Sequence, residues 1–281
     1  MYALGAKAGI VLAKGVAAWH TGSGAMLAEA IHSVADCANQ ILLLVGLRRS
    51  QRPCNEDHPL GYGKAIYFWS FIVALILFSM GGIFSIYEGI HKIRYPEMPH
   101  SPWIAVAVLV ASFGLELVSL KGALVEVRKV QGNRSFLNWF RTSRQSELIV
   151  VTGEDIAALF GLALALAAVL GTIITANPLF DAVGTFAIGA VLILVAAAVG
   201  IEVKSLLIGE SADPETVAAL QEFLLKQHEV GEVYSLITLQ LGTDLMVSAK
   251  VKMNEMGTAF KMIEDINSVE SALRARFPQV R

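Results

Sequence analysis

Cysteine is scarce in this 281-residue sequence, which contains only Cys37 and Cys54. The two do not form a Cys-x-x-Cys pair, so neither a disulfide framework nor a thiolate metal site is indicated. An excess of positive charge is also lacking, because the formal net charge is −2, and we expect no nucleic-acid partner. The first residues have no short apolar core followed by a small-residue cleavage site, so we expect no signal peptide and an insertion driven by the apolar segments themselves.

Long apolar runs dominate the sequence instead. Hydrophobic residues make up 55% of the chain and charged residues 16%, which is unlike an ordinary soluble domain. Six segments are long enough to cross the roughly 30 Å of hydrocarbon in a bilayer. The sequence therefore predicts an α-helical membrane protein with six transmembrane helices, at approximately 3–22, 25–48, 64–91, 102–127, 146–174 and 179–206.

Positive residues are concentrated in the connectors after the second and fourth spans. Connectors rich in lysine and arginine stay on the cytoplasmic side, so we expect both termini on the cytoplasmic or matrix side. No amphipathic, arginine-rich presequence is visible, which favours a bacterial inner membrane. The residues that indicate this orientation are Arg48, Arg49, Arg52, Lys64, Arg128, Lys129, Arg134, Arg141 and Arg144.

The composition after Gly209 is that of a soluble domain. We expect a transmembrane domain over residues 1–208 and a cytoplasmic α/β dimerisation domain over residues 209–281. A two-stranded hairpin is marginal by itself, so we expect a missing third strand or pairing with a second copy of the chain. The expected elements of this tail are a helix from Asp213 to about Gln227, strands over 233–241 and 245–253, and a helix over 259–276.

A histidine and an aspartate lie four residues apart inside the second span. His32 and Asp36 project from one face of a helix, one turn above the other. A neutral imidazole and a carboxylate so placed are two ligands for a borderline divalent cation such as zinc. Ionisable groups are costly within a bilayer and usually mark a pathway or a binding site. The alternative is a buried hydrogen bond between His32 and Asp36 that only helps to pack helices.

The fifth span carries two adjacent acids, Glu154 and Asp155, at about the depth of Asp36. If these two spans are antiparallel neighbours, His32, Asp36 and Asp155 come together as three ligands of a tetrahedral site. Glu154 is the nearest candidate for the fourth, although it is rotated by about 100° from Asp155 around the helix. Its alternative role is to support the ligands or bind a proton. Asn39 shares the face of Asp36 and is a possible weak ligand or hydrogen-bond donor.

Three other charged residues within the apolar segments call for a separate expectation. Lys14 in the first span is expected to face the bundle. Glu29 lies three residues before His32, near the outer end of its span, where hydration alone accounts for it. For Glu116 in the fourth span, structural pairing with Lys14 is at least as good an explanation as a role in transport.

These residues resemble those of the cation diffusion facilitators. His32-Ser33-x-x-Asp36 is similar to that family's metal motif, and Asp57-His58-Pro59-Leu60-Gly61-Tyr62-Gly63-Lys64 to the segment ahead of its third span. Six spans and a small α/β tail match the family over essentially the whole length. In detail, the amino-acid sequences of residues 23–33, 42–49 and 154–158 resemble those of the zinc transporter 9 branch of the family.

The resemblance implies a homodimeric antiporter that exports divalent metal from the cytoplasm in exchange for protons, and therefore not an enzyme. It implies a tetrahedral site between the second and fifth spans, and a ferredoxin-like, metallochaperone-like tail in which the last strand is missing. Metal ligands must be deprotonated, so metal and protons would alternate at the site as it is exposed to each side in turn. Zn²⁺ is the expected cargo, and Mn²⁺, Fe²⁺ or Co²⁺ would also suit one imidazole and several carboxylates.

The sequence departs from the family pattern at one ligand. The position four residues before Asp155 usually holds a ligand and is Val151 here, so Glu154 would have to replace it. Two other functions remain open. One is a dimeric membrane scaffold or regulator that no longer transports, which Val151 favours. The other is a proton- or sodium-coupled carrier of a different substrate, which would not need His32.

Overall fold

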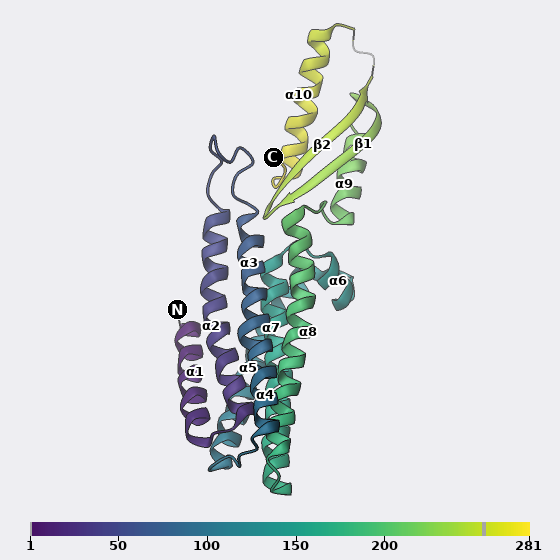
Figure 1. The fold of residues 1–281 in the computed structure, drawn as a ribbon. Coiled ribbons are helices and arrows are strands. Elements are labelled where there is room, and N and C mark those ends of the chain that lie inside the picture. Colours follow the sequence, from purple (N-terminus) through teal and green to yellow (C-terminus); the bar gives the residue numbers. More distant parts are fainter. Residues whose placement is uncertain (1, 255–256) are drawn as a thin grey trace.

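The computed structural model describes residues 2–254 and 257–281, with side chains described from residue 9 onward. Long helices run side by side in a bundle, and a two-stranded sheet with two helices projects from one end of it (Figure 1). We call this the tail end, and the opposite end the far end. The elements are α1 (Tyr2–Thr21), α2 (Gly24–Ser50), α3 (Ala65–Ile76), the π-helical segment η1 (Leu77–Ile83), α4 (Phe84–Arg94), α5 (Pro102–Gln131), α6 (Phe136–Thr142), α7 (Ser146–Thr175), α8 (Leu179–Ile208), α9 (Pro214–Leu225), β1 (Val230–Leu241), β2 (Asp244–Met253) and α10 (Ala259–Arg276).

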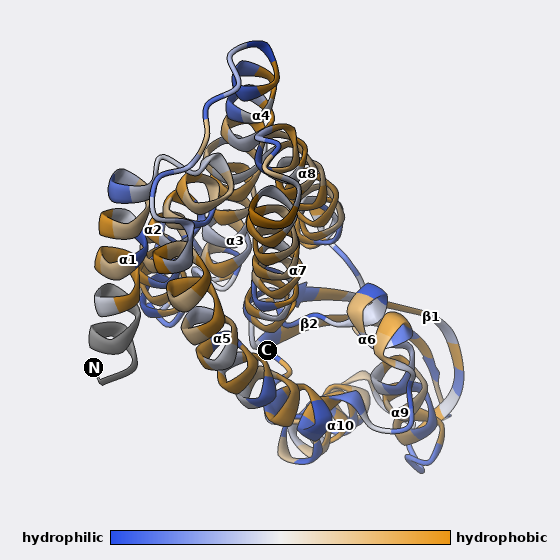
Figure 2. Ribbon diagram, turned by 90° about the horizontal axis from the view of Figure 1, so that it is seen from below, coloured by the Kyte–Doolittle hydropathy of each residue, from blue (hydrophilic) through white to orange (hydrophobic). Residues whose placement is uncertain are grey.

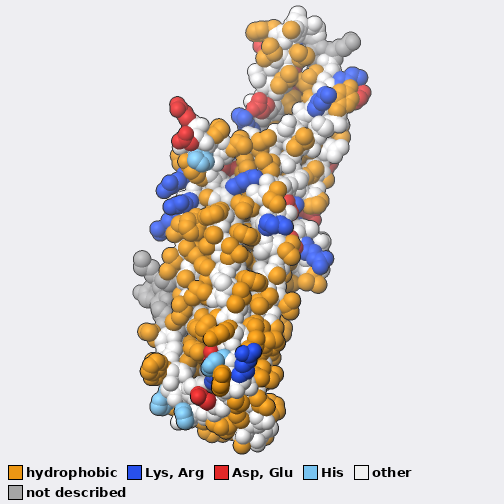
Figure 3. Space-filling view, viewed as in Figure 1, with side chains coloured by type: hydrophobic (Ala, Val, Ile, Leu, Met, Phe, Trp, Pro, Cys, Tyr) orange, Lys and Arg blue, Asp and Glu red, His pale blue; other side chains and the backbone are white. Residues whose placement is uncertain are grey.

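The bundle has the composition of a membrane domain. Within the described residues, five helical segments are long and apolar enough to span a bilayer: α2, the continuous stretch α3–η1–α4, α5, α7 and α8. The helix at the first predicted span, α1, packs against α2 and α5. Hydrophobic side chains cover the middle of the bundle, and lysines and arginines gather chiefly toward the tail end (Figure 3). The predicted α-helical membrane fold with a small α/β tail is confirmed.

The third span is not a regular α-helix throughout, although its uniform apolar sequence predicted one continuous helix. α3 passes into η1, which contains Gly81 and Gly82, before α4 begins. A Cβ atom on Gly82 would lie 2.4 Å from Ile193 Cγ1 of α8, so this close approach of two helices requires glycine. Within and just after η1, the hydroxyls of Ser79 and Ser85 donate to backbone carbonyls four residues earlier. Such π-helical turns occur frequently at functional sites.

Helix α7 is central to the bundle because it contacts α2, α3, α5 and α8. Seen from the far end, α3 and α7 lie between α1 and α2 on one flank and α8 on the other (Figure 2). Small residues permit this packing: a Cβ atom on Gly184 of α8 would lie 2.2 Å from Ala168 Cβ of α7. The central position of α7 brings Glu154 and Asp155 into the interior of the bundle.

The tail contains the predicted hairpin and its two flanking helices. β1 and β2 pair antiparallel, with Leu241 opposite Asp244 at the turn. Val280 adds one parallel bridge to Leu245 of β2, so residues at the end of the chain begin to occupy the position of a third strand. The tail has an apolar core of its own, formed by Ala212, Leu220, Leu224, Leu245, Leu273 and Val280.

The turn of the hairpin contacts the start of α3. The backbone N–H of Gly242 donates to the Tyr67 hydroxyl at 3.0 Å. Gly63 packs against the strand so closely that a Cβ atom there would lie 2.0 Å from the carbonyl oxygen of Leu241. Arg144, ahead of α7, pairs with Glu210 ahead of α9. These contacts attach the tail to the bundle at the ends of α3, α7 and α8.

Candidate metal site

His32 and Asp36 form a contact in the middle of α2. The distance from His32 Nδ1 to Asp36 Oδ1 is 3.5 Å, and the imidazole is fully buried. Gly81 of η1 lies opposite the ring, since a Cβ atom there would be 3.8 Å from Nδ1. The π-helical part of the third span therefore faces the predicted ligands. This pair satisfies both the metal-site interpretation and the simpler one of a packed His–Asp contact.

Glu154 faces α2 and is buried. Its Oε1 accepts a hydrogen bond of 2.5 Å from Asn39 Nδ2. Asn39 follows Asp36 by three residues and lies on the same face of α2, so α7 places Glu154 one turn from the His32–Asp36 pair.

Asp155 faces a different helix. Its Oδ2 accepts a hydrogen bond of 3.0 Å from Ser119 Oγ of α5. The rotation of about 100° between adjacent helical residues explains why Glu154 and Asp155 point to different neighbours. In the part of the chain that the structure describes, no group of three or more His, Cys, Asp or Glu side chains could hold a metal ion. The structure thus joins His32 to Asp36 and Glu154 to Asn39, but does not bring the four predicted ligands together.

A cavity of about 510 Å³ lies between α2, α5 and α7 and reaches Asp155. Val151 also lines it, which shows that the valine shares the face of Asp155 one turn toward the tail. Glu147, eight residues before Asp155, corresponds to about 12 Å along the helix toward the tail end. The other lining residues are Gln40, Leu43, Leu44, Leu47, Ser119, Gly122, Ala123, Glu126 and Leu148. The candidate site therefore has an open space on its tail side.

Residues 1–208 match the family model of the cation efflux transmembrane domain. The chain belongs to the cation efflux family. The predicted resemblance to the cation diffusion facilitators and to the zinc transporter 9 branch is confirmed.

Several named transporters are similar to this cation efflux protein. The mitochondrial proton-coupled zinc antiporter SLC30A9 of Xenopus laevis is 34% identical over 80% of this chain and 41% of its own length. Metal tolerance protein C4 of Arabidopsis thaliana is 32% identical over 77% of this chain and 48% of its own length. The cation-efflux pump FieF of Pectobacterium atrosepticum is 26% identical over 92% of this chain and 82% of its own length. The chain spans less than half the length of the first two relatives.

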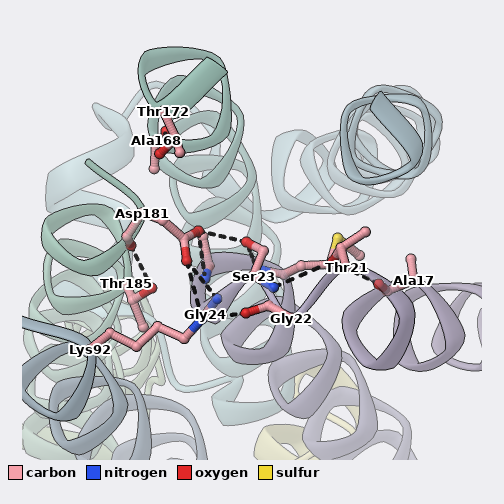
Figure 4. A network of polar contacts seen from close by, with 12 residues as sticks. Ala17, Thr21, Gly22, Ser23, Gly24, Lys92, Ala168, Thr172, Asp181 and Thr185 are labelled. Atoms are coloured by element: carbon pink, nitrogen blue, oxygen red, sulfur yellow. Dashed lines mark hydrogen bonds and ion pairs between the residues drawn. The ribbon is translucent and has the colours of Figure 1, made fainter. Parts of the chain in front are cut away.

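Sequence reasoning missed a carboxylate at the far end of the protein. Asp181, in the first turn of α8, accepts hydrogen bonds from Ser23 Oγ at 2.5 Å and from the backbone N–H of Gly24 at 2.7 Å (Figure 4). The ammonium group of Lys92 lies 3.5 Å from Asp181 Oδ2 and also donates to the Gly22 carbonyl. Asp181 thus ties the first turn of α2 to α4 and α8. An acid in the first turn of a helix, followed by about twenty uncharged residues, is the signal that could have found it.

One expectation about the other charged residues needs correction. Glu29 is fully buried rather than hydrated, and its Oε2 pairs with Lys14 Nζ at 3.2 Å. Lys14 faces the bundle as predicted, and its ammonium group donates hydrogen bonds to Glu29 and Ser33. Lys14 and Glu116 do line one small cavity together with Asp36.

Proposed function

We propose that this protein exports a divalent metal cation, Zn²⁺ in the first instance, from the cytoplasm in exchange for protons. The observation that carries the proposal is the burial of His32, Asp36, Glu154 and Asp155 at one level of an apolar bundle, beside a cavity. Burying these groups in a bilayer is costly without a function. One imidazole and three carboxylates suit a borderline divalent cation.

Assembly of the site would require two side chains to change partners. Asp155 would turn from Ser119 toward α2, and Glu154 would release Asn39. Each change loses a hydrogen bond to a charged group, which is worth about 1.5–3 kcal/mol. Coordination of a divalent cation by deprotonated ligands supplies more than this. Val151 supplies no ligand, so Glu154 is proposed as the fourth, after His32, Asp36 and Asp155.

Proton exchange would follow from the same ligands. Metal binding displaces protons from an imidazole and carboxylates, and protonation expels the metal. An imidazole with its ordinary pKa near 6.5 is suited to this exchange at physiological pH. Exposure of the site to the two sides in turn would couple the two flows by alternating access.

The proposed setting is an inner membrane with the tail and both termini in the cytoplasm. The connectors that follow α2 and α5, which are rich in arginine and lysine, lie toward the tail end (Figure 1). We place this end in the cytoplasm on the basis of the positive-inside rule. We propose residues 1–208 as the transmembrane domain and residues 209–281 as a domain through which two copies form a homodimer. The two-stranded hairpin has little sheet of its own, which supports pairing with a second copy.

The test is Zn²⁺ flux into proteoliposomes under an imposed pH gradient. Asp36→Asn removes a proposed ligand, and Glu97→Gln makes the same chemical change at an exposed connector. We expect gradient-dependent uptake by the wild type and by Glu97→Gln, and its loss in Asp36→Asn. His32→Asn should also abolish uptake, whereas a carrier of another substrate would tolerate it. A folded wild type that moves neither Zn²⁺, Mn²⁺, Fe²⁺ nor Co²⁺ would refute the proposal. Such a result would favour the scaffold, for which the separated ligands and Val151 are the supporting observations.

A further inference from the structure

An ion pair that the proposed metal site does not use is buried between α1 and α2. Lys14 Nζ lies 3.2 Å from Glu29 Oε2 and donates a hydrogen bond of 2.8 Å to Ser33 Oγ. Lys14 is 3% exposed and Glu29 is fully buried. Two desolvated charges of this kind cost several kcal/mol each unless they are paired, so the pair acts as one unit.

The pair also rests on a third helix. Glu29 Oε1 packs against Gly161 of α7 so closely that a Cβ atom at position 161 would lie 2.4 Å from it. Within the described residues, this oxygen accepts no hydrogen bond. Glu29 therefore reaches across from α2 to the backbone of α7, and any larger residue at position 161 would push it away.

Glu29 of the pair lies on the far side of His32, while Lys14 reaches Ser33, the next residue after His32. Glu29 precedes His32 by three residues, about 4.5 Å along the axis of α2 toward the far end. The cavity that reaches Asp155 lies on the tail side. The larger cavity thus approaches the site from the tail side, whereas Glu29 and Gly161 are packed together on the far side.

We propose that Lys14, Glu29 and Gly161 form the far-side closure of the metal pathway. The ion pair holds α1 and α2 against α7, and Glu29 must leave Gly161 before a cation can pass to the far side. That the ion passing through is a metal cation rests on the proposed function. The existence of the closure does not.

An ion pair is suited to a closure that opens repeatedly. When the far side opens, water reaches both charges and restores the hydration that burial removed. An apolar closure would instead expose hydrophobic surface on opening, at about 25 cal/mol for each Å². The contacts among Lys14, Glu29 and Gly161 stabilise the closed state, and hydration of the two charges keeps the free energy of the open state low.

The experiment measures access to a cysteine placed beneath the closure. Ala157 of α7 lies one turn to the tail side of Gly161, on the same helix face, and is fully buried. Ala157→Cys is introduced together with Cys37→Ser, and a membrane-impermeant maleimide is added to the outside of spheroplasts. The exposed native Cys54 at the tail end reports sidedness, because it stays unlabelled when the tail is inside.

Two perturbations should open the closure. Lys14→Met with Glu29→Gln replaces both charges by groups of similar shape, which avoids leaving one charge buried alone. Gly161→Ala displaces Glu29, and Gly114→Ala is the matched control because nothing lies within 4 Å of its Cβ. In the double variant and in Gly161→Ala, we expect the cysteine at position 157 to be labelled about tenfold faster, because the state that is open to the far side becomes more populated. In Gly114→Ala the labelling rate should not change.

A second buried probe separates opening from loosening of the fold. Ala74→Cys lies between α3 and α8, away from the closure, and should stay protected in every variant. Equal labelling of both probes, or unchanged labelling of Ala157→Cys in the double variant and in Gly161→Ala, would overturn the closure. The assay needs no metal, so its outcome is independent of the zinc-flux test. A protein that moves no zinc could still show the closure, and a protein that moves zinc could fail to show it.

Discussion

Removal of the Asp181 carboxylate should loosen the far end of the bundle. This group accepts hydrogen bonds from Ser23 Oγ at 2.5 Å and from the N–H groups of Gly24 and Ala25 at 2.7 and 3.3 Å, at the positive end of α2. The ammonium group of Lys92 lies 3.5 Å away. Asp181 is 1% exposed and Lys92 9% exposed, so little water can replace these contacts.

The magnitude follows from what each substitution leaves behind. Asp181→Ala strands a buried ammonium group, and breaking a buried pair in this way costs about 3–5 kcal/mol. Adding Lys92→Met removes that ammonium and leaves chiefly the loss of contacts at the start of α2, about 1–2 kcal/mol by comparison with helix caps. The double variant should therefore be more stable than Asp181→Ala by about 2–3 kcal/mol.

The assay is reversible unfolding of the purified protein by SDS in mixed micelles, followed by circular dichroism. Asp57→Ala removes a carboxylate from an exposed connector and should change the free energy of unfolding by less than about 0.5 kcal/mol. If Asp181→Ala costs less than about 1 kcal/mol, or if Lys92→Met gives no recovery, the reasoning from the buried pair is wrong.

Two further predictions concern the tail and the ligands. Gly63→Ala should lower stability by about 1–3 kcal/mol and make the tail more sensitive to limited proteolysis, because the new Cβ would overlap a carbonyl oxygen of β1; Gly15→Ala, with open space at its Cβ, should not. Ser119→Ala removes the hydrogen bond that holds Asp155 toward α5, so Zn²⁺ affinity measured by calorimetry should rise up to about tenfold. Ser79→Ala is the control, because the Ser79 hydroxyl donates to the backbone carbonyls of Leu75 and Ile76 one turn earlier in the same span. Equal affinities of the two variants would contradict the proposed movement of Asp155.

The elements of the fold were predictable because they depend on composition and periodicity. The long helices and the hairpin lie close to their predicted ranges, since bilayer thickness fixes the length of an apolar run and alternation marks a strand. Two features escaped. The short helix α6, in a polar connector, has only seven residues. The π-helical turn η1 has no sequence pattern of its own, and becomes understandable only once Gly82 is seen packed on α8.

The candidate site was predictable in its residues but not in its contacts. Burial of His32, Asp36, Glu154 and Asp155 follows from their apolar flanks. Which helix each side chain faces depends on the rotation of α7 among its neighbours, which a single sequence does not encode locally. The burial of Glu29 was missed for the same reason. Its position near the outer end of the span suggested hydration, whereas Lys14 of α1 and Gly161 of α7 cover it.

The placement of the ion pairs gives α2 two unlike halves. Lys14 and Asp181 bind it within residues 23–33, so its far half is held by charged contacts to α1, α4 and α8. Its tail half borders the cavity with three leucine side chains and Gln40. A tilt of α2 that closed the cavity would have to break the far contacts, because a helix moves largely as a rigid body. His32 and Asp36 lie where the charged contacts end and the cavity begins, close to the pivot that such a tilt would have. The proposed site can therefore keep its own geometry while access to it changes, and weakening either far contact should alter the apparent metal affinity only through the population of the two states.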